Sequence, residues 1–119
     1  MSAPTNHKEN DMNAMDYVNE GDLFCCSWGY DQTNVDYYVV SRKTKAMIEL
    51  SEIGVTVTQE GDMSGTARPD QSKVLGVYGM KRPKAYKSGD EIRVYVRMNS
   101  YSSASKVAAD HSNYVSWYA

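Results

Sequence analysis

Apolar and polar side chains alternate along most of the chain beyond residue 22, which is the period-two pattern of strands with one buried face. The alternation is most regular at residues 92–98, where four apolar residues are interleaved with Arg93, Tyr95 and Arg97. The same pattern predicts further strands over residues 22–29, 35–42 and 113–118. Gly-Asp pairs precede two of these segments and favour turns between strands.

The apolar positions change phase in the middle of the chain. Ile48 and Leu50 occupy even positions, whereas Ile53 and Val55 occupy odd ones. A shift of one residue moves a side chain to the opposite face of a sheet. The sequence therefore predicts a bulge or a sharp bend near residues 51–52.

The remaining segments carry weaker signals. Pro69 favours a short edge strand at residues 66–69, because proline cannot donate a hydrogen bond to a neighbouring strand. Residues 74–78 fit either another short strand or part of a long loop, and residues 80–87 are expected to form a basic loop. Near the C-terminus, residues 104–110 fit one helical turn.

Five to seven short strands separated by turns predict an all-β fold, and a small SH3-like or OB-like barrel fits their order. The chain has ten Tyr and two Trp but only three Leu, which is residue usage typical of strands. Its 119 residues suffice for one domain. We predict a single barrel domain over residues 16–119 and a disordered tail at residues 1–15, which are polar and lack an apolar pattern.

The sequence also predicts a compartment. Its N-terminal residues lack the apolar centre of a secretory signal, and no apolar run reaches the ~20 residues of a membrane span. The two cysteines, Cys25 and Cys26, are adjacent, so a disulfide between them would be strained and free thiols are expected. These features predict a cytoplasmic protein that does not associate with membranes.

No catalytic or metal-binding motif is recognisable. Asp110, His111 and Ser112 are consecutive, and neighbours on an extended chain cannot face one another as a catalytic triad requires. The acidic residues within 31–36 lack the spacing of a calcium-binding loop, and the glycines do not form a phosphate-binding loop. We therefore expect a protein that is not an enzyme and requires no cofactor or metal.

Charge is distributed unevenly, although the net charge is only −2. Residues 1–36 hold one lysine and seven acids (−6), whereas residues 73–97 hold seven Lys or Arg and two acids (+5). Cations interleaved with tyrosines can contact phosphates while the rings stack on bases, although the acidic total weighs against a nucleic-acid-binding barrel. The residues of this alternative are Lys81, Arg82, Lys84, Lys87, Arg93 and Arg97.

The string Ser-Trp-Gly-Tyr-Asp-Gln-Thr-Asn-Val-Asp-Tyr-Tyr at residues 27–38 separates the first two expected strands. It places aromatic and hydrogen-bonding side chains at one corner, and Trp and Tyr are typical anchors of protein interfaces. The residues predicted to bind a partner are Trp28, Tyr30, Asp31, Gln32, Thr33, Asn34 and Asp36. In the architectural alternative, the aromatic rings close one end of the barrel while Asp31 and Asn34 turn the chain.

This string, together with the small residues at 100–105 and the Ser-Trp-Tyr at residues 116–118, resembles a widespread group of small proteins encoded by bacteriophages, prophages and plasmids. The resemblance covers residues 22–58 and 99–118, and the group has no assigned catalytic residues to transfer. It implies an origin in a mobile element and little else. Combined with the predicted compartment, this gives the cytoplasm of a host cell as the expected location.

Small phage proteins without enzymatic motifs often act by binding host proteins. The leading hypothesis from the sequence is therefore a non-enzymatic binding protein that engages a host protein, for example as an inhibitor of a host defence complex of the anti-CRISPR or anti-restriction type. The nucleic-acid-binding barrel is the alternative, and self-association of the chain stays open.

Overall fold

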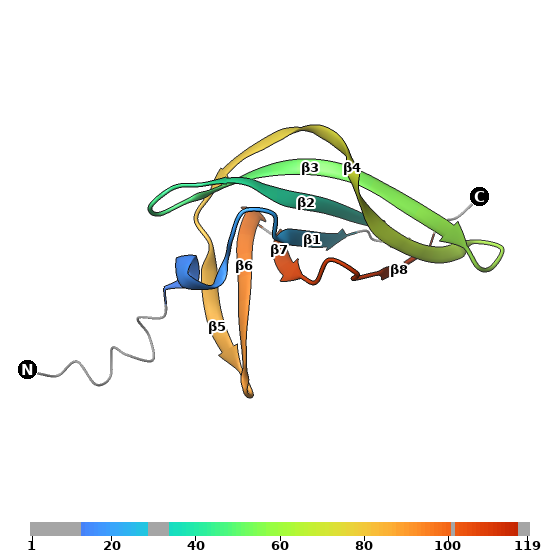
Figure 1. Cartoon of the computed structure of the whole chain (residues 1–119). Coiled ribbons are helices and arrows are strands. Elements are labelled where there is room, and N and C mark those ends of the chain that lie inside the picture. Colours follow the sequence, from blue (N-terminus) through green and yellow to red (C-terminus); the bar gives the residue numbers. More distant parts are fainter. Residues whose placement is uncertain (1–12, 29–33, 101, 117–119) are drawn as a thin grey trace, which may run out of the picture.

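The computed structural model describes residues 13–28, 34–100 and 102–116. They form one antiparallel sheet with the strand order β5-β6-β7-β1-β2-β3-β4-β8, which confirms the all-β prediction (Figure 1). A short 3-10 helix, η1 (Ala14–Tyr17), precedes the sheet. The strands are β1 (Leu23–Trp28), β2 (Asn34–Lys43), β3 (Ile48–Gln59), β4 (Ser64–Lys81), β5 (Lys84–Ser88), β6 (Glu91–Asn99), β7 (Ser102–Val107) and β8 (Asn113–Ser116).

The sheet is open within the described residues, with β5 at one end of the strand order and β8 at the other. This differs from the predicted closed barrel of five to seven strands. The reason lies in the central strands, which bury side chains on both faces: in β1, Leu23 and Cys25 enter one core, while Phe24 and Cys26 enter another. A barrel encloses a single core, whereas this sheet needs cover on both sides of its centre.

The first core lies between the central strands and a layer formed by β6, β7 and η1. Its buried residues are Ala14, Met15, Val18, Phe24, Cys26, Tyr38, Val40, Ile48, Leu50, Val94, Val96, Met98 and Ala104. Lys43 fixes η1 to the sheet, because its Nζ donates to the backbone carbonyls of Met15 (2.8 Å) and Val18 (2.7 Å). The folded part therefore includes residues 13–15, which the sequence predicted to belong to the tail; residues 1–12 lie outside the described residues.

The second core lies on the opposite face of the central strands and is covered by β4 and β8. Its buried residues are Leu23, Cys25, Val35, Tyr37, Ile53, Ala67 and Val115. Strand β8 reaches this core by pairing with the beginning of β4, over residues 64–67. The two ends of the sheet thus cover opposite faces of its middle.

Strand β3 is continuous across the change of phase, because alternate side chains of this strand face different cores. Leu50 lies opposite Val40 in the first core, and Ile53 lies opposite Tyr37 in the second. Pairing with β2 is regular from Ile53 to Leu50, while the pairing with β4 shifts register there. The predicted bulge is therefore at the expected position, but the extra residues belong to β4.

Strand β4 is one long strand rather than the two short segments predicted at residues 66–69 and 74–78. Across its bulges, Val74 lies opposite Ile53 and Val77 opposite Ser51, so three steps along β4 match two along β3. The sequence Val-Leu-Gly-Val-Tyr-Gly at residues 74–79 places a glycine after each extra residue, with φ of +151° at Gly76 and +150° at Gly79. Such angles favour glycine and let the strand arch above β3 (Figure 1).

Two further predictions were wrong, because residues expected in a basic loop (80–87) and in a helical turn (104–110) belong largely to strands β5 and β7. The turn at Gly89 (φ +62°) joins β5 to β6 as a hairpin. The lysines of β5 leave it with little apolar alternation, so the sequence pattern did not predict this strand. The small polar residues of β7 are held between β1 and β6, so pairing on both edges determines their conformation.

A buried polar group joins β8 to the centre of the sheet. The Tyr37 hydroxyl donates to Asn113 Oδ1 (2.8 Å) and lies 3.0 Å from the carbonyl oxygen of Ala67, while the Cys25 thiol lies 3.1 Å from the same Oδ1. Burial raises the pKa of Tyr37 to about 12, with a contribution from Cys25, so its hydroxyl keeps the proton needed to donate at neutral pH.

Replacing Tyr37 with phenylalanine is expected to destabilise the fold by about 1–2 kcal/mol, because Asn113 Oδ1 would keep only the weak thiol donor of Cys25 and the carbonyl of Ala67 would lose its hydroxyl neighbour. For a domain of this size the melting temperature should fall by roughly 5–15 °C, measured by circular dichroism. Tyr86→Phe is the matched control, since Tyr86 is exposed. Equal melting temperatures for the two variants would contradict this role of the hydroxyl.

Candidate nucleic-acid interface

The hairpin of β5 and β6, extended by β7, presents basic and aromatic side chains on its outer surface. Tyr86 lies opposite Arg93, and Tyr95 lies opposite Lys84 on one side and Ser105 on the other. Arg97 lies opposite Ser103. We call this surface the basic–aromatic face, and it comprises Lys84, Tyr86, Arg93, Tyr95, Arg97, Ser103 and Ser105.

The alternate residues of the same strands anchor this face. Val94, Val96 and Ala104 are buried in the first core, and Ala85 packs against it. Because successive residues of a strand point to opposite faces, burial of these four directs their neighbours outward. The face is therefore supported by a packed core and does not depend on a loop for its shape.

The face carries one exposed aromatic ring, that of Tyr86, next to the half-buried Tyr95. Tyr86 is 49% exposed, and its ring lies 5.8 Å from that of Tyr95 in an edge-to-face arrangement with an interplanar angle of 65°. An exposed aromatic ring can stack on a planar group such as a nucleobase. The pair thus offers a preformed apolar contact between charged neighbours.

The cations of the face are engaged only weakly by the protein. Arg93 forms an ion pair with Glu91 at 3.2 Å, but both side chains are exposed, and such pairs contribute little to stability. Arg97 donates from Nη1 to the backbone carbonyl of Ser100 at 3.3 Å. Lys84 is exposed and forms no ion pair with a described residue. Three cations against one carboxylate give this face a positive charge.

The structure separates the remaining basic residues predicted for this site. Lys87 lies opposite Ile92, on the alternate side of the hairpin, so it does not join the face. Lys81 lies 5.3 Å from the centre of the Tyr78 ring, and its Nζ is 3.4 Å from the carbonyl oxygen of Met98. Arg82 follows the end of β4 and lines a groove described below.

The predicted partner-binding corner is described only at its ends. Trp28 and Asn34 are paired as the last residue of β1 and the first of β2, so the string does join the first two strands. Asp36 is half-buried in β2, opposite Cys26. Tyr30, Asp31, Gln32 and Thr33 lie outside the described residues, and their recognition role stays a prediction.

A surface that the sequence pattern did not predict lies on the arch of β4. Val74, Leu75 and Val77 are 63%, 62% and 66% exposed, and we call these three residues the apolar row. Strand β8 pairs only with residues 64–67 of β4, so within the described residues no further strand covers the edge of the arch. The repeated Val-Leu-Gly and Val-Tyr-Gly was the signal that could have indicated this arch.

The cysteines have the environment of structural thiols. Both are buried and unpaired with each other. Burial, with the nearby Cys26 and Asp36, raises the pKa of Cys25 to about 11, and burial also raises the pKa of Cys26, with a contribution from Asp36. A nucleophilic cysteine needs the opposite shift, toward the thiolate. These two thiols are therefore poorly suited to nucleophilic catalysis at neutral pH.

The described part of the chain contains no group of three or more His, Cys, Asp or Glu side chains placed to hold a metal ion. None of its helical segments has the length and apolar character to cross a bilayer. Comparisons with protein-family models, with curated proteins and with solved structures found no match to this chain.

Proposed function

We propose that this protein is a non-enzymatic binding protein that holds single-stranded nucleic acid on the basic–aromatic face. The observation that carries the proposal is the register of β5, β6 and β7, which interleaves three cations with two tyrosines on one outward face. Cations follow a phosphate backbone, while exposed rings stack on bases and contribute about 1–3 kcal/mol per base.

Single strands fit this face better than duplexes. The rings of Tyr86 and Tyr95 can stack only on bases whose faces are accessible, and a duplex hides those faces within its own stack. The serines of β7 add hydroxyl groups that can donate to phosphate or sugar oxygens. Nothing in this arrangement selects a particular base, so the proposed binding depends weakly on sequence.

The net charge of −2 does not oppose this assignment, because the charge is segregated along the chain. Residues 73–97 carry +5, and they include every cation of the face. A locally basic surface can attract a polyanion although the whole chain is slightly acidic, and Glu91, which pairs with Arg93, still leaves this face an excess of cations.

Salt dependence of binding tests the proposal directly. A fluorescently labelled single strand of about 12 nucleotides should bind, as measured by fluorescence anisotropy, and its affinity should fall roughly 20-fold between about 50 and 200 mM salt. The expected slope of log affinity against log salt is about −2, since three cations each release part of a counterion from a single strand. No binding at the lower salt, or equally strong binding to a duplex, would refute the proposal.

A second candidate is binding to a host protein, which the resemblance to phage and plasmid proteins suggested. The apolar row favours it, because large exposed apolar side chains can mark protein-binding surfaces. If no oligonucleotide binds, Val77→Lys and the parent protein should be compared for retention of a purified host protein. Equal retention would exclude the row as the interface.

A further inference from the structure

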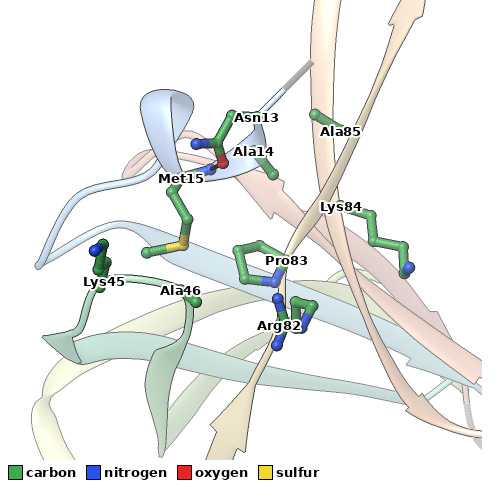
Figure 2. A pocket seen from close by; sticks show the side chains of 9 residues that line it. All are labelled: Asn13, Ala14, Met15, Lys45, Ala46, Arg82, Pro83, Lys84 and Ala85. Carbon is green, nitrogen blue, oxygen red and sulfur yellow. Dashed lines mark hydrogen bonds between the residues drawn. The ribbon is translucent and has the colours of Figure 1, made fainter. Parts of the chain in front are cut away.

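A groove of about 450 Å³ lies where three distant segments of the chain meet. It is bounded by η1, by the turn between β2 and β3 at Lys45 and Ala46, and by the corner between β4 and β5 at Arg82 and Pro83 (Figure 2). Met15 and Pro83 form apolar walls, and both are buried by their packing. The groove is thus built on the first core rather than on a free loop.

The charge that the described residues bring to this groove has one sign. Lys45, Arg82 and Lys84 line it, and no carboxylate of a described residue does. Within the described residues none of the three forms an ion pair, and each side chain is exposed.

Several other basic residues of the described chain have partners. Arg42 pairs with Glu49 at 3.5 Å, and Lys106 pairs with Asp22 at 3.7 Å. Lys43, which is adjacent to the same turn, is satisfied by two backbone carbonyls beneath η1. No described carboxylate forms an ion pair with the three cations of the groove, and a bound anion would relieve their mutual repulsion.

We propose that this groove binds a phosphate monoester attached to a small planar group. The monoester carries a charge of about −1.5 to −2 at neutral pH, which matches three cations better than a single carboxylate does. The guanidinium of Arg82 can donate two parallel hydrogen bonds to phosphate oxygens. The apolar walls suit the organic part of the ligand, and the volume lies within the range of small-molecule sites.

Two kinds of ligand carry such a phosphate monoester: a free mononucleotide and the phosphorylated end of a nucleic-acid strand. The second source rests on the proposed function, because Lys84 belongs both to the groove and to the basic–aromatic face. A strand lying on the face could then place its terminal phosphate across the β5 edge, in the groove.

Titration with a nucleoside monophosphate, followed by NMR chemical shifts, tests the groove itself. We expect saturable binding, with the unphosphorylated nucleoside at least about tenfold weaker. Arg82→Gln and Lys45→Gln should each weaken the monophosphate about tenfold, whereas Lys87→Gln, an exposed lysine outside the groove, should not. All of these residues are exposed, so unchanged melting temperatures should confirm intact folds.

Oligonucleotides ending in a phosphate or a hydroxyl identify the source. A gain in affinity from the terminal phosphate that disappears in Arg82→Gln assigns the groove to strand ends. Binding of the monophosphate without such a gain assigns it to free nucleotides. If neither the monophosphate nor the terminal phosphate shows binding that depends on Arg82, the groove proposal is overturned. Failure of hydroxyl-ended strands to bind refutes only the proposed function, because those strands need no groove.

Discussion

Replacing Gly65 with alanine is expected to prevent stable folding of the β4–β8 end of the sheet. A Cβ at this position would clash with the backbone carbonyl oxygen of Thr58 and lie 3.2 Å from the Cα of Gln59. Both neighbours are backbone atoms of the paired strand β3, so no side-chain rotation relieves the contact. Overpacking of this kind costs about 3 kcal/mol or more, a large part of the 5–15 kcal/mol that stabilises a typical domain.

Thermal unfolding followed by circular dichroism would measure this effect, and a fall of at least about 10 °C in melting temperature is expected. Gly89→Asn is the matched control, because Gly89 has a φ of +62°, open space around it and a conformation that Asn tolerates. A melting temperature for Gly65→Ala equal to that of the control would show that β3 and β4 are not held this closely.

The sequence predicted strands well wherever one face is buried and the other exposed. Strand β6 is the clearest example, since Val94 and Val96 are buried while Arg93 and Arg97 are exposed. Hydrophobic alternation carries this information because it reports directly which side chains leave water. The all-β class and most of β1, β2 and β6 followed from that signal.

The closed barrel was wrong because alternation cannot reveal that two faces of a strand are buried in different cores. Leu23, Phe24, Cys25 and Cys26 form a continuous apolar run, and all four are buried. Such a run is typical of a strand covered on both sides. The run is therefore consistent with a sheet that has a core on each face. It does not tell which strands cover each face, because pairings between distant parts of the chain determine the cover.

The candidate site was predictable on one strand and hidden on the other. Arg93, Tyr95 and Arg97 share a face by their spacing alone, which the sequence showed. The sequence could not place Lys84 and Tyr86 beside them, because the register of the β5–β6 hairpin decides which lysines join the face. In the observed register, Lys84 lies on the basic–aromatic face and Lys87 lies on the opposite side of the hairpin.

The double variant Arg93→Gln with Arg97→Gln should abolish most binding of single-stranded nucleic acid. Each charge-assisted contact with phosphate contributes about 1.4 kcal/mol or more, so affinity at low salt should fall about 100-fold. The salt slope should shrink from about −2 to about −0.7, because two of three cations no longer displace counterions. Gln retains hydrogen-bonding capacity and length, so the change isolates charge.

The fold should survive this substitution, because both arginines are exposed and the Arg93–Glu91 pair contributes little to stability. Lys87→Gln controls for a general loss of positive charge, since Lys87 belongs to the same hairpin but faces the opposite side. Anisotropy titrations of the parent and both variants over several salt concentrations would give affinity and slope together. An equal loss of affinity in Lys87→Gln would place the phosphate contacts away from the basic–aromatic face. Weaker binding of the double variant with an unchanged salt slope would do the same, because only removal of a contacting cation changes the number of counterions released.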